Sequence, residues 1–272
     1  MSWKRIKTFL IILFLLINIY LISSTNGFKL KSVTEFDVDN ISKTVNVIYN
    51  NYGIRIDTTD IPKRITNLNI INVDNIMFSE EFVDKYEFSK NAHGFSFSIA
   101  TDTFSYNEKN AAEEIREVLD TMGIAGDSYK LEFKITDIGL LCTVYEYVDV
   151  YPLFNGRIEA HFSSREIKIS GNWYFSQTES LEAKDTSLRM TDISGVLVDM
   201  AYTAYEQTIK SDASADMPKA VKSIEYGYYV SSYDENVISK SASAVPCYMI
   251  ETDLGSKYYY DVVNGNLLKQ ED

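Results

Sequence analysis

The fold is decided by residues 107–136, NEKNAAEEIREVLDTMGIAGDSYKLEFKIT, in which a helical period gives way to a strand period. The first part places apolar side chains on one face of a helix, at Ile115, Val118, Leu119 and Met122. Gly123 ends that helix, and apolar residues then alternate with lysine and glutamate, at Tyr129, Leu131, Phe133 and Ile135. Such alternation is typical of a strand with one buried face. A helix followed by a half-buried strand predicts an α+β fold.

The segment that follows continues this unit. Residues 141–150 indicate a second strand, and Asn155-Gly156 lies between apolar flanks. Because Asn-Gly tolerates two positive φ angles, it predicts a hairpin turn at that point. Residues 166–169 and 171–175 then complete a first helix-plus-antiparallel-meander unit, which we place at 107–184.

The same order recurs in the last third of the chain. Thr191 is the expected cap of a helix whose inward residues are Ile193, Leu197, Met200 and Ala204. Strands are predicted at 224–230, 245–251 and 258–263, and Asn264-Gly265 turns the chain into Leu267-Leu268. We therefore predict a second helix-plus-antiparallel-meander unit at 185–272.

Residues 37–106 precede these two units and show weaker patterns. Ile41, Val45, Ile48 and Tyr52 form a helical stripe that begins at Asp37 or Asp39 and ends at Gly53. Residues 58–74 are expected to form a loop around Ile61-Pro62, and residues 75–88 two short strands or a strand and a turn. The alternation of Phe95, Phe97 and Ile99 with small residues predicts one further strand.

An apolar run occupies residues 8–24, behind a basic tail at residues 1–7 that contains Lys4, Arg5 and Lys7. A helix of this length spans about 25 Å, slightly less than the hydrocarbon core of a bilayer. The basic tail predicts a cytoplasmic amino terminus, a single transmembrane helix in the cell membrane, a linker at 25–36 and an extracytoplasmic remainder. A cleaved signal peptide is the alternative, because residues 23–27 offer a weak cleavage site.

Composition restricts the partners of the chain. The formal net charge is -13, from 39 acidic and 26 basic residues, and this excess of negative charge repels nucleic acid. Tyrosine and phenylalanine are abundant, with 20 and 14 residues, as expected for a protein rich in half-buried strands. We expect protein partners and no nucleic acid.

Few residues suggest catalysis. The two histidines, His93 and His161, lack a Gly-x-Ser-x-Gly elbow, and with two dispersed cysteines they give no zinc spacing. The chain contains no Gly-rich phosphate loop. We therefore predict no enzyme activity, no catalytic residue, no cofactor and no metal site.

Two further features leave alternatives open. Cys142 and Cys247 lie in strand-like runs and are either two small buried residues or a disulfide. In Tyr258-Tyr259-Tyr260 the middle ring faces away from its neighbours. One side of this strand is expected in the core, and the other is either core or a protein-binding strip.

Taken together, several loose motifs resemble the YycI family of low-GC Gram-positive bacteria. They cover nearly the whole chain: Trp3-Lys4-Arg5-Ile6-Lys7 before the apolar run, Tyr52-Gly53-Ile54, Ile61-Pro62, Gly171-Asn172-Trp173, Val245-Pro246-Cys247-Tyr248, and Tyr258 to Gly265. The resemblance implies an extracytoplasmic α+β domain similar to PepSY and YycH modules. It further implies a membrane-anchored regulator that, with a YycH-like partner, modulates the sensor histidine kinase YycG (WalK) of a cell-wall two-component system, by default restraining it.

Contact in that family is thought to run through membrane helices, so the resemblance places the site in the apolar run. The residues we assign to partner binding are Phe9, Phe14, Ile17, Asn18 and Leu21. Asn18 either forms an interhelical hydrogen bond or lies at the interface of a tilted helix. The alternative function is an exported peptide- or protease-binding module, with the helix as a simple tether.

Overall fold

The computed structural model of the chain describes residues 34–35, 38–62, 64–65, 70–86, 88–91, 94–101, 106–137, 139–176, 191–210, 216–230 and 241–271. The short pair β1 (Thr34–Glu35) and β2 (Arg64–Ile65) is antiparallel and belongs to a unit separate from the rest. All other described elements belong to one compact unit, and everything below concerns that unit.

The helices of this unit are α2 (Val38–Tyr52), α3 (Glu80–Lys85), α4 (Glu108–Thr121) and α5 (Ile193–Lys210). Its strands are β3 (Ile71–Asn75), β4 (Ser89–Asn91), β5 (Gly94–Ala100), β6 (Tyr129–Thr136), β7 (Gly139–Val148), β8 (Tyr151–Phe162), β9 (Glu166–Gly171), β10 (Tyr174–Ser176), β11 (Val221–Val230), β12 (Ser241–Thr252), β13 (Lys257–Asp261) and β14 (Leu267–Glu271).

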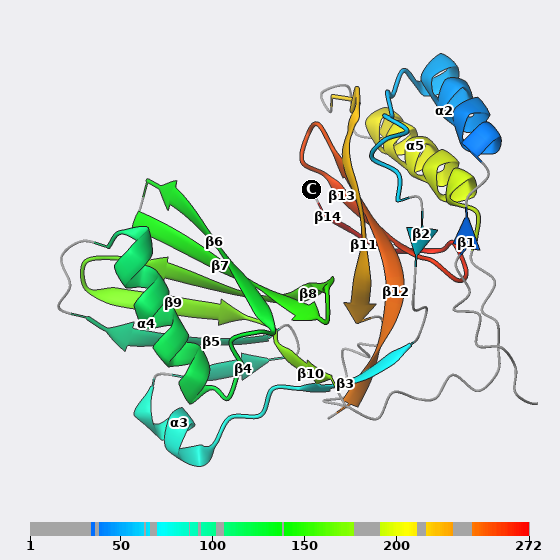
Figure 1. Ribbon diagram of the computed structural model, residues 1–272. Helices are drawn as coiled ribbons and strands as arrows, with labels where there is room; N and C mark the ends of the chain where they lie inside the picture. The colour runs from blue at the N-terminus through cyan, green and yellow to red at the C-terminus, as the bar shows by residue number, and fades with distance from the viewer. Residues whose placement is uncertain are drawn as a thin grey trace, which may run out of the picture. The chain divides into compact units, whose positions relative to one another are not determined.

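These twelve strands are linked by hydrogen bonds into one sheet system (Figure 1). Neighbouring strands pair antiparallel, except β8 and β11, which meet in parallel at Leu153 and Tyr228. The structure is therefore α+β with a mostly antiparallel sheet, as predicted.

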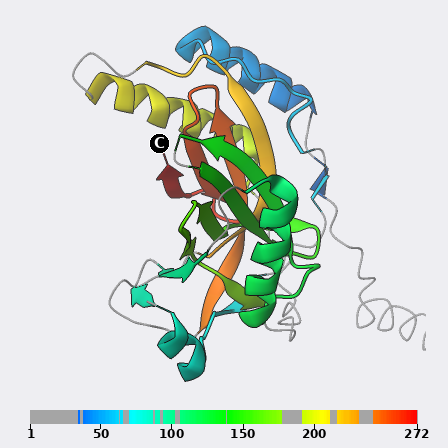
Figure 2. The ribbon, with the colours of Figure 1, turned by 90° about the vertical axis from the view of Figure 1, so that its left-hand side faces the viewer.

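The strands β6, β7, β8, β9, β5 and β4 lie side by side in that order, and α4 covers one of their faces (Figures 1 and 2). Burial along β7 follows the period of two, so that Leu140, Cys142 and Val144 face the helix. Asn107 caps α4 by accepting from the backbone N–H of Lys109 and Asn110. The predicted helix and strand of residues 107–136 are confirmed, although Ile135 is 84% exposed.

The strands β11, β12, β13 and β14 form a second antiparallel meander, which follows α5 in the chain. The predicted inward residues of α5 are all buried: Ile193, Leu197, Met200 and Ala204. The expected cap at Thr191 was wrong, because its hydroxyl donates to the Val263 carbonyl at 2.8 Å. Asp192 takes that place, since its carboxylate accepts from the Ser194 N–H at 3.0 Å.

Helix α2 confirms the predicted stripe and lies beside α5 (Figures 1 and 2). Asn40 donates to the Asp192 carboxylate at 2.8 Å, and the rings of Tyr52 and Tyr205 meet edge to face at 5.6 Å. Gly53 has a φ of 73° as the left-handed stop, and Ile54 beyond it is fully buried.

The predicted Asn155-Gly156 hairpin was wrong, because β8 runs without a break from Tyr151 to Phe162. The turn between β7 and β8 lies instead at Asp149, whose φ is 56°. Within β8, the Asn155 amide bonds to the backbone of Val230, and Gly156 leaves space for the side chain of Glu146. Asn155-Gly156 thus forms a contact between strands that are distant in the sequence and does not form a turn.

Two other expectations were wrong. Residues 80–85 form α3, because the Ser79 hydroxyl accepts from the Phe82 N–H and starts a helix in a segment expected to hold strands. Residues 71–74 belong to β3, which pairs with β10 and β12 and is not a loop. The strand β3 is paired with strands distant in the sequence, and α3 begins at a single capping residue. Neither feature produces a periodic pattern in the sequence.

Candidate functional site

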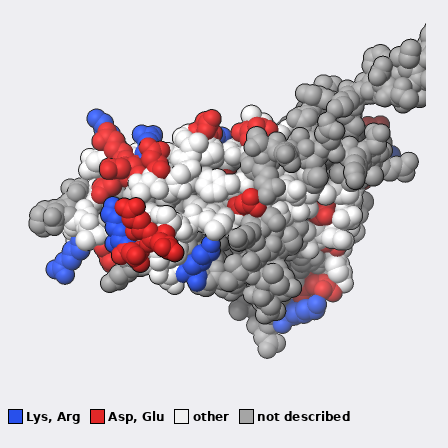
Figure 3. All heavy atoms as spheres, turned by 90° about the horizontal axis from the view of Figure 1, so that it is seen from below, with Lys and Arg blue, Asp and Glu red and all other residues white. Residues whose placement is uncertain are grey.

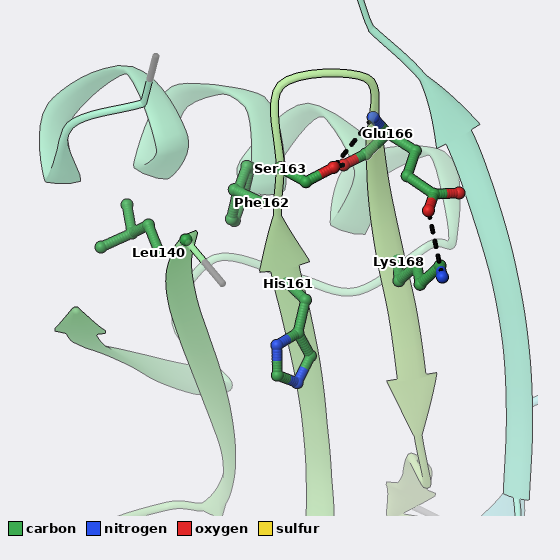
Figure 4. A pocket seen from close by; sticks show the side chains of 7 residues that line it. Leu140, His161, Phe162, Ser163, Glu166 and Lys168 are labelled. Atoms are coloured by element: carbon green, nitrogen blue, oxygen red, sulfur yellow. Dashed lines mark hydrogen bonds and ion pairs between the residues drawn. The ribbon is translucent and has the colours of Figure 1, made fainter. Parts of the chain in front are cut away.

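The pocket that contains His161 lies where β8 turns into β9 (Figure 4). The Ser163 hydroxyl donates to the Glu166 carbonyl at 2.7 Å and accepts from the Glu166 N–H at 3.2 Å, so it closes the turn. The His161 ring points away from Ser163 in Figure 4, and Lys168 pairs with the Glu166 carboxylate at 3.0 Å. The pocket holds about 200 Å³, less than the roughly 300 Å³ of a small ligand site.

A wider groove lies between α4 and β6. One wall is a row of α4 side chains spaced by four residues, namely Ala112, Arg116 and Asp120. The floor is the inward face of β6, formed by Tyr129, Leu131 and Phe133, and Gly126 lies at one end. The groove holds about 520 Å³. Burial raises the pKa of the Tyr129 hydroxyl, and the Arg116 guanidinium opposes that rise.

A third surface is an apolar stripe on α5, defined by Val198, Tyr202, Tyr205 and Ile209. These residues are spaced as one face of a helix, and each is between 39% and 63% exposed. The stripe therefore offers aromatic and aliphatic contact area outside the core, a composition typical of protein interfaces.

Charge on the described surface is mixed. In Figure 3, acidic and basic side chains lie next to one another on the described part of the face shown. Two ion pairs of the described residues lie at the surface: Lys210 with Glu206, both exposed, and Lys222 with Glu251, whose carboxylate is partly buried. Such pairs add little stability, so their main effect is on which partners can approach.

A buried carboxyl that was not predicted from the sequence lies at the junction of β7, β8 and β10. Glu146 is 3% exposed, and its Oε2 accepts from the Tyr174 N–H at 3.0 Å. Burial raises the pKa of Glu146 well above its usual value, and the bond from Tyr174 acts in the opposite direction. The sequence feature that could have predicted this burial is the spacing of Glu146 from Cys142 and Val144, because alternate residues of β7 lie on its buried face.

Both cysteines are buried free thiols, so the alternative of two small buried residues is the one that the structure contains. Burial raises the pKa of Cys142 to about 12 and that of Cys247 well above its usual value. We expect Ellman's reagent to label neither thiol in the folded chain at pH 8, and both after unfolding in guanidinium. Only one or no thiol in the unfolded chain would contradict this expectation.

Of the two alternatives left open for Tyr259, burial in the core is the one that the structure contains, since all three tyrosines of β13 are buried. The Tyr259 ring lies 5.6 Å from Phe154 of β8 and 5.1 Å from Tyr229 of β11. The second face of the strand is therefore covered by segments distant in sequence.

The partner-binding residues assigned from the sequence, Phe9, Phe14, Ile17, Asn18 and Leu21, lie outside the described residues, as does His93. Within the described part of the chain, no helix combines the length and apolar character needed to cross a bilayer. The same part contains no cluster of three or more His, Cys, Asp or Glu side chains placed to hold a metal ion.

The fold thus defines an α+β protein whose described surface includes a groove at α4 and β6 and an apolar stripe on α5. No family model and no curated protein matches the sequence. Among solved structures, the chain is similar to an uncharacterized protein from Eubacterium rectale ATCC 33656, with 9% identity and a TM-score of 0.43. The match covers 79% of this chain and 89% of that one.

Proposed function

We propose that this chain is a membrane-anchored extracytoplasmic regulator that binds and restrains a sensor histidine kinase of a cell-wall two-component system, with a YycH-like partner. The observation that carries the proposal is the apolar run at residues 8–24 behind Lys4, Arg5 and Lys7. The resemblance to the YycI family supplies the kind of kinase. On this proposal the body is extracytoplasmic.

We also propose that the fold is PepSY- and YycH-like, with two consecutive helix-plus-meander units. Its support is the order of elements, since α4 precedes the antiparallel strands β6 to β9 and α5 precedes β11 to β14. The apolar stripe on α5 is the surface that we assign to contact with the kinase or the YycH-like partner outside the membrane.

The membrane helix acts, on this proposal, by favouring one of two arrangements of the kinase helices. The residues that we assign to contact with the kinase are Phe9, Phe14, Ile17, Asn18 and Leu21. A coupling free energy of about 1–3 kcal/mol is enough to change kinase output by roughly 5- to 150-fold. The Asn18 carboxamide fixes which side of the helix faces the kinase, because an amide in hydrocarbon is stabilised by a polar partner.

The test replaces residues 8–24 by an unrelated membrane helix and measures expression of wall-hydrolase genes. We expect expression to rise about tenfold as restraint is lost, a change inside the range of ordinary allosteric coupling. Asn18→Leu is expected to give part of that rise, with Ile12→Leu as the matched control. Output that stays at the wild-type level after the helix is replaced removes the helix from the mechanism.

The groove between α4 and β6 favours a second candidate, an exported peptide- or protease-binding module for which the helix is only a tether. A soluble fragment of residues 30–272 separates the two functions. If the module is correct, this fragment restores regulation in cells that lack the full chain. If the regulator acts through its helix, the fragment does not.

A further inference from the structure

Among the strands that the structure describes, β6 leaves one of its sides unpaired. Among the described strands it bonds only to β7, and its eight residues make it longer than the other strands with a single neighbour, β4, β10 and β14. Figure 1 shows β6 at the outer side of its group of strands. An open strand side is a template for pairing with another extended chain.

The register decides which backbone groups of β6 face that open side. Tyr147 N donates to Ser128 O at 2.8 Å, which makes this pair a hydrogen-bonded one, and Tyr129 pairs next with Glu146. Directly opposite residues alternate between bonded and non-bonded pairs. The residues that direct N–H and C=O groups outward are therefore Tyr129, Leu131, Phe133 and Ile135.

The same outward-directed residues form the floor of the groove against α4. Tyr129, Leu131 and Phe133 line it opposite Ala112, whose small side chain leaves space beside the strand. An incoming strand places alternate side chains on one face of the sheet. Its residues opposite Leu131 and Phe133 would consequently enter this apolar part of the groove.

The charged residues on the other face of β6 determine which residues are favoured at the remaining positions of the incoming strand. Lys130 and Lys134 are exposed there, on either side of Glu132. Opposite charges on directly opposed residues stabilise a strand pair. An incoming strand is favoured when it carries acidic residues opposite the two lysines and a neutral residue opposite Glu132.

We propose that β6 and α4 form a binding site for an extended peptide that adds antiparallel to β6, with an acidic–apolar–neutral–apolar–acidic pattern. Antiparallel addition continues the pairing that β6 already has with β7. The proposal deepens the second candidate function and rests on it, because it names the ligand class of the binding module. The mode is β-augmentation, in which backbone bonds supply affinity and side-chain pockets supply specificity.

The probe is a fluorescein-labelled, capped peptide of sequence Ser-Glu-Val-Thr-Val-Glu-Ser, titrated against the full chain in mild detergent and followed by anisotropy. We expect saturable binding, and about tenfold weaker binding when lysine replaces both glutamates. The double variant Lys130→Glu and Lys134→Glu is expected to reverse this preference. No saturable binding by the glutamate peptide overturns the proposal.

Methylation of the peptide backbone separates strand addition from simple groove binding. The two valines lie opposite outward-directed residues, so methylating their nitrogens removes bonds to β6 and should abolish binding. Methylation of the threonine nitrogen, which points away from β6, should leave affinity within about threefold. Binding that survives methylation of both valines overturns the proposal.

A groove-filling variant gives a second test on α4. Ala112→Trp is expected to abolish peptide binding, whereas Glu117→Trp, on an exposed part of the same helix, is the matched control. Thermal melting reports whether each variant folds. If Ala112→Trp does not fold, the reversed peptide preference of the Lys130→Glu and Lys134→Glu variant remains as the test.

A dimer that excludes the peptide would assign β6 to a second copy and overturn the proposal. Capture of a partner by residues 30–272 without peptide binding would leave the module standing and remove only this site.

Discussion

Asn155→Ala is expected to lower the free energy of unfolding by about 2–4 kcal/mol, because it leaves two buried backbone groups unpaired. The Asn155 Nδ2 donates to the Val230 carbonyl at 3.1 Å, and its Oδ1 accepts from the Val230 N–H at 3.0 Å. Val230 is buried at the end of β11, and its neighbourhood contains Leu153 and Tyr228. The side chain thus completes the parallel contact between β8 and β11.

Urea unfolding, followed by circular dichroism, measures this loss. Asn155→Asp keeps the acceptor for the Val230 N–H but places a carboxylate oxygen against the Val230 carbonyl, so a loss at least as large as that of Asn155→Ala is expected. Asn46→Ala changes an exposed asparagine of α2 and should remain within about 0.5 kcal/mol of the wild type. If Asn155→Ala matches that control, the carboxamide does not hold β8 to β11.

Glu146→Gln is expected to be more stable than the wild type at pH 8, because glutamine removes the cost of burying a charged carboxylate. Burial raises the pKa of Glu146 in the folded chain, so the folded state holds its proton over a pH range in which the unfolded state has lost it. The contribution of this group to stability is therefore fully present below the unfolded value near pH 4.3 and is lost as pH rises through the folded pKa.

Glutamine keeps an oxygen to accept from the Tyr174 N–H but carries no charge at high pH. The difference between variant and wild type should consequently grow from pH 4 upward and reach a plateau above the folded pKa. Denaturant unfolding at a series of pH values measures it, and Glu117→Gln, at an exposed position, is the control. Parallel stability curves for Glu146→Gln and the wild type would show that Glu146 does not titrate abnormally.

Both predictions concern the region where β8 leaves β7 and meets β11. The pairing of β7 with β8 shifts between Tyr145 and Tyr147, and Glu146 lies at this shift. A Cβ at Gly156 would lie 2.2 Å from the Glu146 Oε2, so this glycine is required by the close approach. The two meanders are joined by the bonds of Asn155 to Val230 and by apolar contacts such as that of Phe154 with Tyr259.

For a regulator or a binding module, this connection matters because the two candidate surfaces lie on different meanders. The groove uses α4 and β6, whereas the apolar stripe lies on α5. The contact between β8 and β11 joins the two meanders that contain these surfaces. Asn155→Ala in the peptide-binding assay would test whether the groove depends on that contact.

The candidate surfaces were predictable from the sequence only in part. The apolar face of α4 and the alternation of β6 follow from residues 107–136, because a helix and a half-buried strand each leave a period in the sequence. Two further features depend on strand order: Ala112 and Leu131 share one groove, and β6 has a single neighbour among the described strands. The membrane site at Phe9 to Leu21 stays a prediction from the sequence.

By itself, the sequence determined the α+β class, the helices α2, α4 and α5 and most of the strands. It also determined the glycine stops at Gly53 and Gly123 and the turn at Gly265. These features are local, because each depends on residues within a few positions of one another. Only the tertiary structure decided that Asn155-Gly156 continues a strand, that both faces of β13 are buried, and that Glu146 is enclosed. In each case the deciding partner is distant in sequence, at Val230, Phe154 or Tyr174, and a period along the chain carries no information about which distant segment will cover a given face.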